Sequence, residues 1–256
     1  MPTKRKKKKS PLKTKPLRQA GESLAEELDD VIGTKIMPWM SLILTFTVLA
    51  GFEWLRWWRK MPPQPVLFSI LALVAIVVSI WRIWKSLKYG ANLYLGRQGE
   101  IVVSQCLDSL KSDGYRVFDD IIGDGFNVDH VLVGPGGVFA IETKTHSKPG
   151  GDVHVVYDGK TLTVAGHTPD RNPIEQVINA SRHIRDILKT EVPDIKVKSV
   201  LIYPGWYTEQ PRNPEVWVLN ETVLPKWIRK ELRSLTDEKA ARISGILATH
   251  VRGKAY

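Results

Sequence analysis

The sequence predicts an α/β domain with a mixed sheet flanked by helices, preceded by two transmembrane helices. Two long uncharged runs near the start, and alternating helical and strand patterns from Gly96 onward, predict this arrangement. We expect a basic, largely disordered cytoplasmic tail over 1–35 and a two-helix hairpin over 36–85. An α/β domain should follow over 96–205, and a strand and helices over 206–256 should complete it.

The two uncharged runs have the length of membrane spans. They begin at Ile36 and Met61 and contain 17 and 21 residues. About 20 helical residues cross the hydrocarbon layer, so we expect spans at about 37–57 and 65–84. Indole rings settle at headgroup depth, and six of the nine tryptophans flank these runs: Trp39, Trp54, Trp57, Trp58, Trp81 and Trp84.

Flanking charge predicts the orientation of the hairpin. Ten basic residues precede the first run and three lie between the runs, so the positive-inside bias places both termini in the cytoplasm of a multi-pass cell-membrane protein. A long polar leader and an immediate second run argue against a cleaved signal peptide. The basic stretch KRKKKK at 4–9 is either a solvated topology signal or a patch for anionic lipid or nucleic acid.

Charge and cysteine content exclude several function classes. The net charge is +10, of which residues 1–85 carry +9 (15 basic, 6 acidic) and residues 86–256 carry +1 (22 basic, 21 acidic). The larger part therefore has no bulk attraction for polyanions, and a nucleic-acid function must rest on a site. The single cysteine, Cys106, excludes an intrachain disulfide and a cysteine zinc cluster, and we expect it to be a buried, reduced thiol.

Residues 127–144, NVDHVLVGPGGVFAIETK, predict two apolar strands around a tight turn. A hairpin centred between Pro135 and Gly136 sets Asp129 directly opposite Glu142. Directly opposed like charges are destabilising, so we expect something cationic near the two carboxylates. Lys144 follows Glu142 by two residues and therefore shares its face of the sheet.

The remaining elements follow from helical spacing and turn signals. A helix is expected from Gly96, with Gly114 as its stop. A later helix has Asn172 as N-cap and Pro173 in its first turn. Further strands are expected at 115–121, 196–204 and 215–219, with a second hairpin turning at Asp158-Gly159 and two short helices ending the chain.

An ordered set of motifs carries a family resemblance. Gly99-Glu100 opens a helix, Asp129 lies in NVDHVLVGP, and GVFAIETK and NPIEQ follow. Together these motifs resemble the nuclease-related (NERD) domain, which is similar to the restriction-endonuclease-like fold of PD-(D/E)xK nucleases and Holliday-junction resolvases. The resemblance covers about 96–205, and Val128-Asp129 departs from it by standing where the signature has Pro-Asp.

The resemblance implies roles for five residues. It makes Asp129 and Glu142 metal ligands, Lys144 the lysine of the acid-x-Lys motif, Glu100 a helix-borne acid, and Gln176 the glutamine of the following helix. It implies a Mg²⁺- or Mn²⁺-dependent nuclease that hydrolyses phosphodiester bonds in DNA. Two carboxylates with main-chain oxygen and water suit Mg²⁺ by themselves, and the lysine can orient the attacking water or neutralise the transition state.

Each site residue also has a structural interpretation. Asp129 and Glu142 can form an ion-pair cluster with Lys144 as its cation. Glu100 can simply favour a helix N-terminus, and Gln176 can be a surface amide, although its place in a first turn suits phosphate contacts.

Neighbouring basic and histidine side chains also have structural interpretations. Arg182, with Arg185 and Lys189, is most simply a solvated helix face, with contact to a nucleic-acid backbone as the alternative. His130 points to the face opposite Asp129 and is expected to be a core or edge histidine.

Two functions from different classes remain. The first is a membrane-anchored, metal-dependent nuclease acting on DNA. The second is a non-catalytic NERD module that binds nucleic acid or a protein partner at the membrane, and a purely structural membrane protein is the third interpretation. The acid-x-Lys set favours the first, whereas the near-neutral charge of residues 86–256 favours the second.

Overall fold

The structure is a computed structural model that describes residues 17–61, 64–123, 125–151 and 153–254. The chain divides into two compact units. One is Glu22–Gln98, and the other combines the segment up to Gly21 with Gly99–Tyr256.

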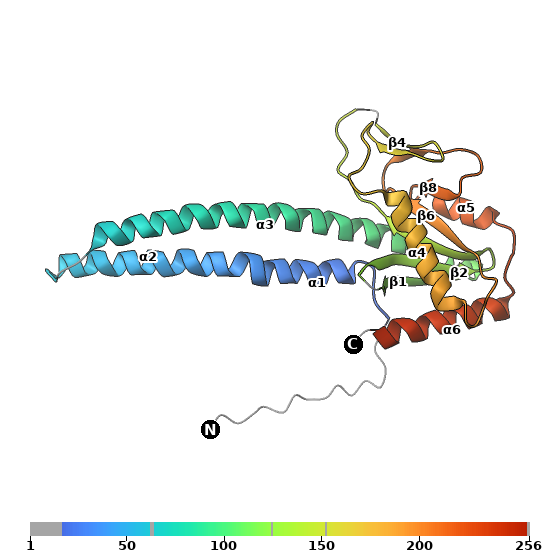
Figure 1. Cartoon of the computed structure of the whole chain (residues 1–256), viewed down its shortest axis with the longest axis horizontal. Helices are drawn as coiled ribbons and strands as arrows, with labels where there is room; N and C mark the ends of the chain where they lie inside the picture. The colour runs from blue at the N-terminus through green and yellow to red at the C-terminus, as the bar shows by residue number, and fades with distance from the viewer. Residues whose placement is uncertain (1–16, 62–63, 124, 152, 255–256) are drawn as a thin grey trace, which may run out of the picture. The chain divides into compact units, whose positions relative to one another are not determined.

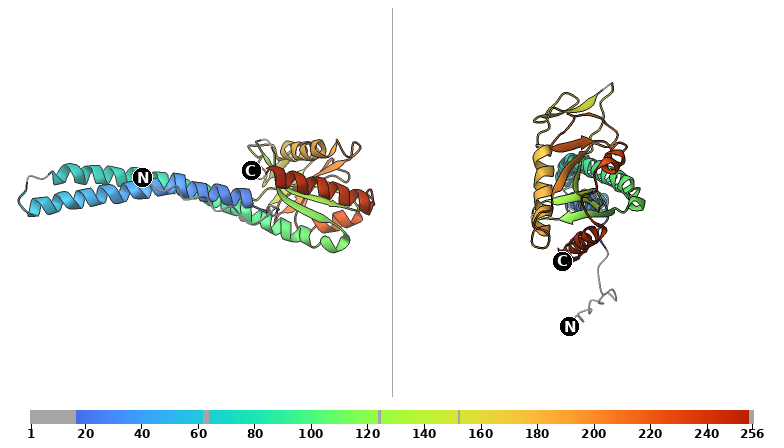
Figure 2. Two further views of the ribbon diagram at one scale, coloured as in Figure 1. Left: turned by 90° about the horizontal axis from the view of Figure 1, so that it is seen from below. Right: turned by 90° about the vertical axis from the view of Figure 1, so that its right-hand side faces the viewer.

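The unit Glu22–Gln98 is helical. It contains α1 (Glu22–Asp30), the π-helical turn η1 (Val31–Ile36), α2 (Met37–Trp58) and most of α3 (Pro65–Asp108). The stretch α1–η1–α2 and the first part of α3 lie side by side (Figures 1 and 2). By length and composition, both helical stretches are long and apolar enough to cross a membrane. Their apolar side chains are largely uncovered, as at Leu44 (66% exposed).

Helix α3 differs from the expectation of two separate helices around 65–84 and 96–110. It runs without interruption from Pro65 to Asp108. The residues that join the two predicted helices contain no proline, and a lone glycine such as Gly90 is tolerated inside a helix at a cost of about 1 kcal/mol. A short 3₁₀ turn, η2 (Lys111–Asp113), follows. Gly114, predicted as the stop of the helix, instead caps this 3₁₀ turn with a left-handed φ of 86°, and α3 itself ends earlier, at Asp108.

The start of the chain also differs from the expected tail over 1–35, because α1 begins at Glu22. The basic stretch at 4–9 lies outside the described residues.

A five-stranded mixed sheet forms the centre of the other unit, as expected. The strand order is β1-β2-β3-β6-β8. The first three strands pair antiparallel, whereas β6 is parallel to β3 and β8 is parallel to β6. The strands are β1 (Arg116–Ile122), β2 (Asn127–Gly134), β3 (Gly137–Thr143), β6 (Val197–Ile202) and β8 (Val216–Leu219).

Alternating side chains bury both faces of this sheet. On one face, Val131 and Ala140 pack in a core with α4 (Pro173–Leu188) and α6 (Asp237–Lys254). On the other face, Leu132 packs with α5 (Leu224–Lys230) and with the part of α3 from Gly99 onward. Figure 1 shows α4 lying across the strands. Helix α6 has 18 residues and is longer than the short helix expected there.

The second predicted hairpin forms, but in a separate small sheet. Its strands β4 (His154–Tyr157) and β5 (Leu162–Val164) pair antiparallel, and β7 (Tyr207–Glu209) adds to β4 in parallel. The connection turns at Asp158-Gly159 as expected, with Asp158 Oδ1 accepting the backbone N–H groups of Lys160 and Thr161.

Candidate active site

The β2–β3 hairpin has the register that its turn predicts. Gly134 pairs with Gly137 and His130 with Ile141, so Asp129 is set opposite Glu142 at the next position. Asp129 Oδ2 accepts the backbone N–H of Thr143 at 2.7 Å. The two carboxylates thus belong to one face of the sheet, the face that carries α4.

Lys144 supplies a cation to one of these acids. Its Nζ lies 2.7 Å from Glu142 Oε1, and the Lys144 side chain remains 27% exposed. The backbone N–H of Lys144 donates to Ile202 O at 2.8 Å, which continues the β3–β6 pairing and fixes the direction of the side chain. The expectation of a cation at the acid pair is therefore met at Glu142.

Asp120 is a third acid that sequence reasoning missed. Asp119 pairs with His130 and Ile121 with Val128, so Asp120 stands opposite Asp129 on the neighbouring strand. Asp120 has a left-handed φ of 51° and is only 3% exposed. A pair of aspartates inside the strand RVFDDII was the available signal. Asp120, Asp129 and Glu142 thus hold matching register positions on three adjacent strands, although the left-handed backbone at Asp120 interrupts the alternation of side chains in β1.

The buried charge of Asp120 is compensated from the N-terminal segment. Arg18 Nε donates to Asp120 Oδ2 at 2.8 Å, and Asn127 Nδ2 donates to Oδ1 at 3.2 Å. The Arg18 side chain is 10% exposed, so this is a buried ion pair.

Glu100 joins the acids because α3 approaches the end of β3 closely. A Cβ atom at Gly99 would lie 1.8 Å from Thr145 Oγ1, so only glycine fits there. The next residue, Glu100, is buried, and its pKa is raised to about 7 by burial and then by the charge of Asp120, with a smaller contribution from Glu142. A hydrogen bond from the Gly21 backbone opposes this shift.

Asp129 shows the same excess of negative charge. Burial raises the pKa of Asp129 well above its usual range, and the charges of Glu142 and Glu100 raise it further. The Thr143 N–H and Lys144 act in the opposite direction. A cation bound beside these carboxylates would stabilise their charged forms and so lower the pKa values of Asp129 and Glu100.

A cavity of about 460 Å³ opens beside the acids. Glu142 lines it together with Gln176 and Arg182, so it brings together three residues that the sequence proposed for one site. Asn172 caps α4 as predicted, accepting the Ile174 N–H at 3.1 Å, and this places Gln176 in the first turn. Arg182 donates to Asn179 Oδ1 at 3.2 Å on the same wall.

Several buried polar atoms near the acids have no hydrogen-bond partner among the described residues. They are Gln176 Oε1, Thr143 Oγ1, Thr145 Oγ1 and Tyr203 OH. Burial raises the pKa of Tyr203 above its usual range, and the charge of Glu142 adds to the shift, so the Tyr203 hydroxyl stays protonated near this acid. Buried polar atoms without partners are uncommon and call for water or a ligand. Nothing in the apolar strand VKSVLI predicted a role for the tyrosine that follows it.

Comparison with known families decides the identity of this unit. Residues 95–204 match the family described as the nuclease-related domain, NERD. Residues 95–204 are a NERD domain. The match agrees with the sequence resemblance over 96–205, and it contains Glu100, Asp129, Glu142, Lys144 and Gln176.

Two further comparisons add little to the NERD assignment. No curated protein matches the chain. A solved structure, described as the crystal structure of a protein of unknown function AF1548, is 11% identical, covers 60% of this chain and 100% of its own, and has a TM-score of 0.26. A TM-score this low supports no argument about the NERD domain.

Other candidate residues lie outside this cluster. His130 is fully buried, and its Nδ1 lies 2.7 Å from Asp119 Oδ1, which confirms a core histidine. Cys106 is a free thiol as expected, partly buried, and its Sγ donates to Glu221 O at 2.7 Å. Burial raises the pKa of Cys106, which disfavours a nucleophilic thiolate. Lys189 pairs with Asp186 on an exposed part of α4.

The donor set of the NERD domain fits a hard cation. Within the described ranges, no group of three or more His, Cys, Asp or Glu side chains is arranged to hold a metal ion. The two predicted ligands, Asp129 and Glu142, would therefore need oxygen atoms from water, the main chain or an amide. Mg²⁺ is commonly held by one or two carboxylates and several waters. The raised pKa values of Asp129 and Glu100 and the partnerless Gln176 Oε1 are consistent with such a site.

Proposed function

We propose that this protein is a membrane-anchored, metal-dependent nuclease that hydrolyses phosphodiester bonds in DNA at the cytoplasmic face. The observation that carries the proposal is the set of acids at matching register positions on β1, β2 and β3, with Lys144 paired to Glu142 at the mouth of a cavity. The match to a nuclease-related family supports the same reaction class.

Each residue has a chemical role in this proposal. Asp129 and Glu142 hold Mg²⁺ or Mn²⁺, which when bound stabilises charge on the phosphoryl oxygens and lowers the pKa of water. Lys144, released from Glu142 or shared with it, orients the attacking water or neutralises the transition state. Glu100, with a pKa of about 7, is suited to accept or release a proton at neutral pH.

The cavity supplies the binding contacts for DNA. Gln176 offers an amide in the first turn of α4, where the helix end favours anions. Arg182 lies one turn and a half further along α4 and provides a cation for a backbone phosphate.

A non-catalytic NERD module that binds nucleic acid or a protein partner is the second candidate. The observation that favours it is the Lys144–Glu142 ion pair, in which the lysine already neutralises the carboxylate that would bind metal. The small net charge of residues 86–256, +1, also gives DNA little non-specific attraction.

The anchoring part of the proposal rests on the two apolar helical stretches and the flanking charge. Both termini are proposed to be cytoplasmic. A reporter that is active only outside the membrane should be silent when fused after Tyr256, and activity there would reverse the orientation. Release of the chain from membranes by alkaline carbonate would contradict the proposed membrane anchoring.

The nuclease proposal is tested with the full-length chain in detergent. Linear, supercoiled, branched and single-stranded DNA, together with RNA, are incubated with Mg²⁺ or Mn²⁺, and chelator is added to a parallel set. Cleavage of at least one DNA substrate, stopped by chelator, is expected. Metal binding without cleavage of any substrate would favour the binding module.

A further inference from the structure

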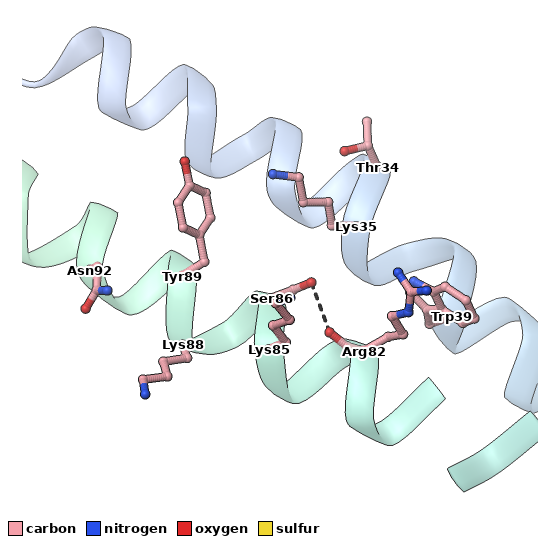
Figure 3. A pocket seen from close by; sticks show the side chains of 9 residues that line it. All are labelled: Thr34, Lys35, Trp39, Arg82, Lys85, Ser86, Lys88, Tyr89 and Asn92. Atoms are coloured by element: carbon pink, nitrogen blue, oxygen red, sulfur yellow. Dashed lines mark hydrogen bonds between the residues drawn. The ribbon is translucent and has the colours of Figure 1, made fainter. Parts of the chain in front are cut away.

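A second cavity lies within the unit Glu22–Gln98 and shares no lining residue with the acid cluster. Its volume is about 700 Å³, and residues from η1, the start of α2 and α3 line it. Figure 3 shows Lys35 and Tyr89 pointing from opposite helices into the space between them, and Arg82 reaching toward Trp39. The proposed nuclease function uses none of these residues.

The lining is strongly basic. It contains Lys35, Arg82, Lys85 and Lys88 and no aspartate or glutamate. Among the residues that the structure describes, none of these four side chains forms an ion pair with a carboxylate. Lys88 points away from the opposite helix (Figure 3), whereas Lys35 and Arg82 lie against aromatic rings of the cavity and are its inner cations.

Aromatic rings position the two inner cations without neutralising them. Lys35 Nζ lies 4.8 Å from the centre of the Tyr89 ring, and the Arg82 guanidinium lies 5.3 Å from the centre of the Trp39 ring. The hydroxyl of Tyr89 in turn donates to Glu27, which ties the ring to α1. The nearest acids on the same helical stretch, Glu27 and Asp30, therefore have partners, since Asp30 accepts from Thr34 Oγ1.

The cavity lies where the first apolar run begins and where the second one ends. Lys35 immediately precedes the first expected span, 37–57, and Arg82 lies at the end of the second, 65–84. Trp39 and Trp81 belong to the tryptophans expected at headgroup depth. The neighbouring turn of α3 is apolar and uncovered, with Val78 41% and Ile80 57% exposed.

We propose that this cavity binds the phosphate of an anionic phospholipid headgroup, with Lys35 and Arg82 as its main contacts. The proposal rests on the membrane anchoring in the proposed function. Basic pockets between membrane helices suit anionic headgroups, and the uncovered apolar side chains beside the pocket would receive the acyl chains. A free phosphate ion would have the same charge but no use for that apolar surface.

The test measures lipid retention by the full-length chain in an uncharged detergent, using native mass spectrometry. Phosphatidylglycerol and phosphatidylcholine with identical acyl chains are titrated separately. We expect one phosphatidylglycerol per chain to bind at least tenfold more tightly than phosphatidylcholine. Inorganic phosphate at the same concentration should not displace it. Equal affinity for the two lipids, or displacement by inorganic phosphate, would overturn the proposal.

Substitutions locate the binding to this cavity. Lys35→Gln with Arg82→Gln should weaken phosphatidylglycerol binding about thirtyfold, because each basic side chain near an anionic surface contributes about a factor of five. Arg59→Gln with Lys60→Gln removes the same two charges beyond the other end of α2 and should change binding less than threefold. Equal losses in the two variants would show a general charge effect and refute the site.

Membrane insertion is checked separately, because removing basic residues can alter topology. Carbonate extraction of wild type tests the anchor, independently of lipid affinity in detergent. If the double variant fails to insert, Lys35→Gln alone retains most of the flanking charge and should weaken binding about fivefold. Unchanged affinity in a correctly inserted Lys35→Gln variant would contradict the assignment.

Discussion

The ammonium group of Lys144 lies 2.7 Å from Oε1 of Glu142, two positions earlier in the chain. Asp129, set opposite Glu142, accepts instead the backbone N–H of Thr143. Four acids, counting Asp120 and Glu100, thus gather around two basic side chains, Lys144 and Arg18. Burial raises the pKa values of Glu100 and Asp129, the remaining negative charge raises them further, and the cluster is therefore receptive to a cation.

The first prediction concerns pH and stability. The pKa of Glu100 is about 7 in the folded chain against an ordinary value of 4.5, so the folded state binds this proton more tightly than the unfolded state. Without metal, the contribution of Glu100 to stability should be fully present below pH 4.5 and should be lost as the pH rises to about 7. This difference in pKa corresponds to about 3 kcal/mol.

The Glu100→Gln variant isolates this contribution. Chemical unfolding in chelator at pH 5 and pH 8 should show that the variant loses less stability than wild type between the two values. Parallel losses in both proteins would mean that Glu100 titrates at an ordinary pKa.

The second prediction concerns metal and thermal stability. A ligand that binds only the folded state stabilises it, so Mg²⁺ or Mn²⁺ well above its Kd should raise the Tm by about 5 °C or more. Asp129→Asn or Glu142→Gln should abolish the rise, and above pH 7 either change should reduce repulsion in the metal-free chain. Asp170→Asn removes an exposed acid and should leave the rise intact. A wild-type Tm that does not change when metal is added would favour the structural ion-pair interpretation.

The third prediction concerns the close approach of α3 to β3. Gly99→Ala should lower stability by several kcal/mol, since its new Cβ would lie 1.8 Å from Thr145 Oγ1. Adding Thr145→Ala should recover part of the loss by removing that oxygen. Gly245→Ala is the matched control, because nothing lies within 4 Å of its Cβ position and alanine favours a helix. Equal effects at Gly99 and Gly245 would show that α3 does not approach β3 this closely.

The fourth prediction concerns the buried pair of Arg18 and Asp120. Arg18→Met should destabilise the metal-free chain by about 3 kcal/mol, because it removes the paired cation from a buried carboxylate. Asp120→Asn in the same chain should restore much of the loss. Arg229→Met breaks the more exposed pair with Asp113 and should cost about 1 kcal/mol or less. A double variant no more stable than Arg18→Met would contradict charge compensation as the cause.

The sequence predicted the parts of the site that local geometry determines. A tight turn fixes the register of its hairpin, which sets Asp129 opposite Glu142, and strand periodicity adds Lys144 to their face. The Asn172 cap likewise determined where α4 begins and hence the position of Gln176. These relationships span few residues and involve known turn and cap chemistry.

The parts that sequence reasoning missed depend on contacts between distant segments. Asp120 comes close to the other acids only because β1 pairs with β2, and the backbone of Asp120 has a left-handed φ at this point. Its partner Arg18 is 102 positions away along the chain. Tyr203 reaches the site from the end of β6, and no local pattern marks it. Continuity of α3 was also missed, because helical periodicity shows no boundary where two predicted helices join.

The most direct test of the central claim compares metal binding and DNA cleavage in two variants of the full-length chain. Lys144→Ala should retain metal binding but lower metal-dependent cleavage on the order of a hundredfold, as expected when a transition-state contact is lost. Glu142→Ala should lose both properties, and the exposed-lysine control Lys160→Ala should keep both. Cleavage that is unchanged in Glu142→Ala would contradict the account, because the activity would then belong to another site.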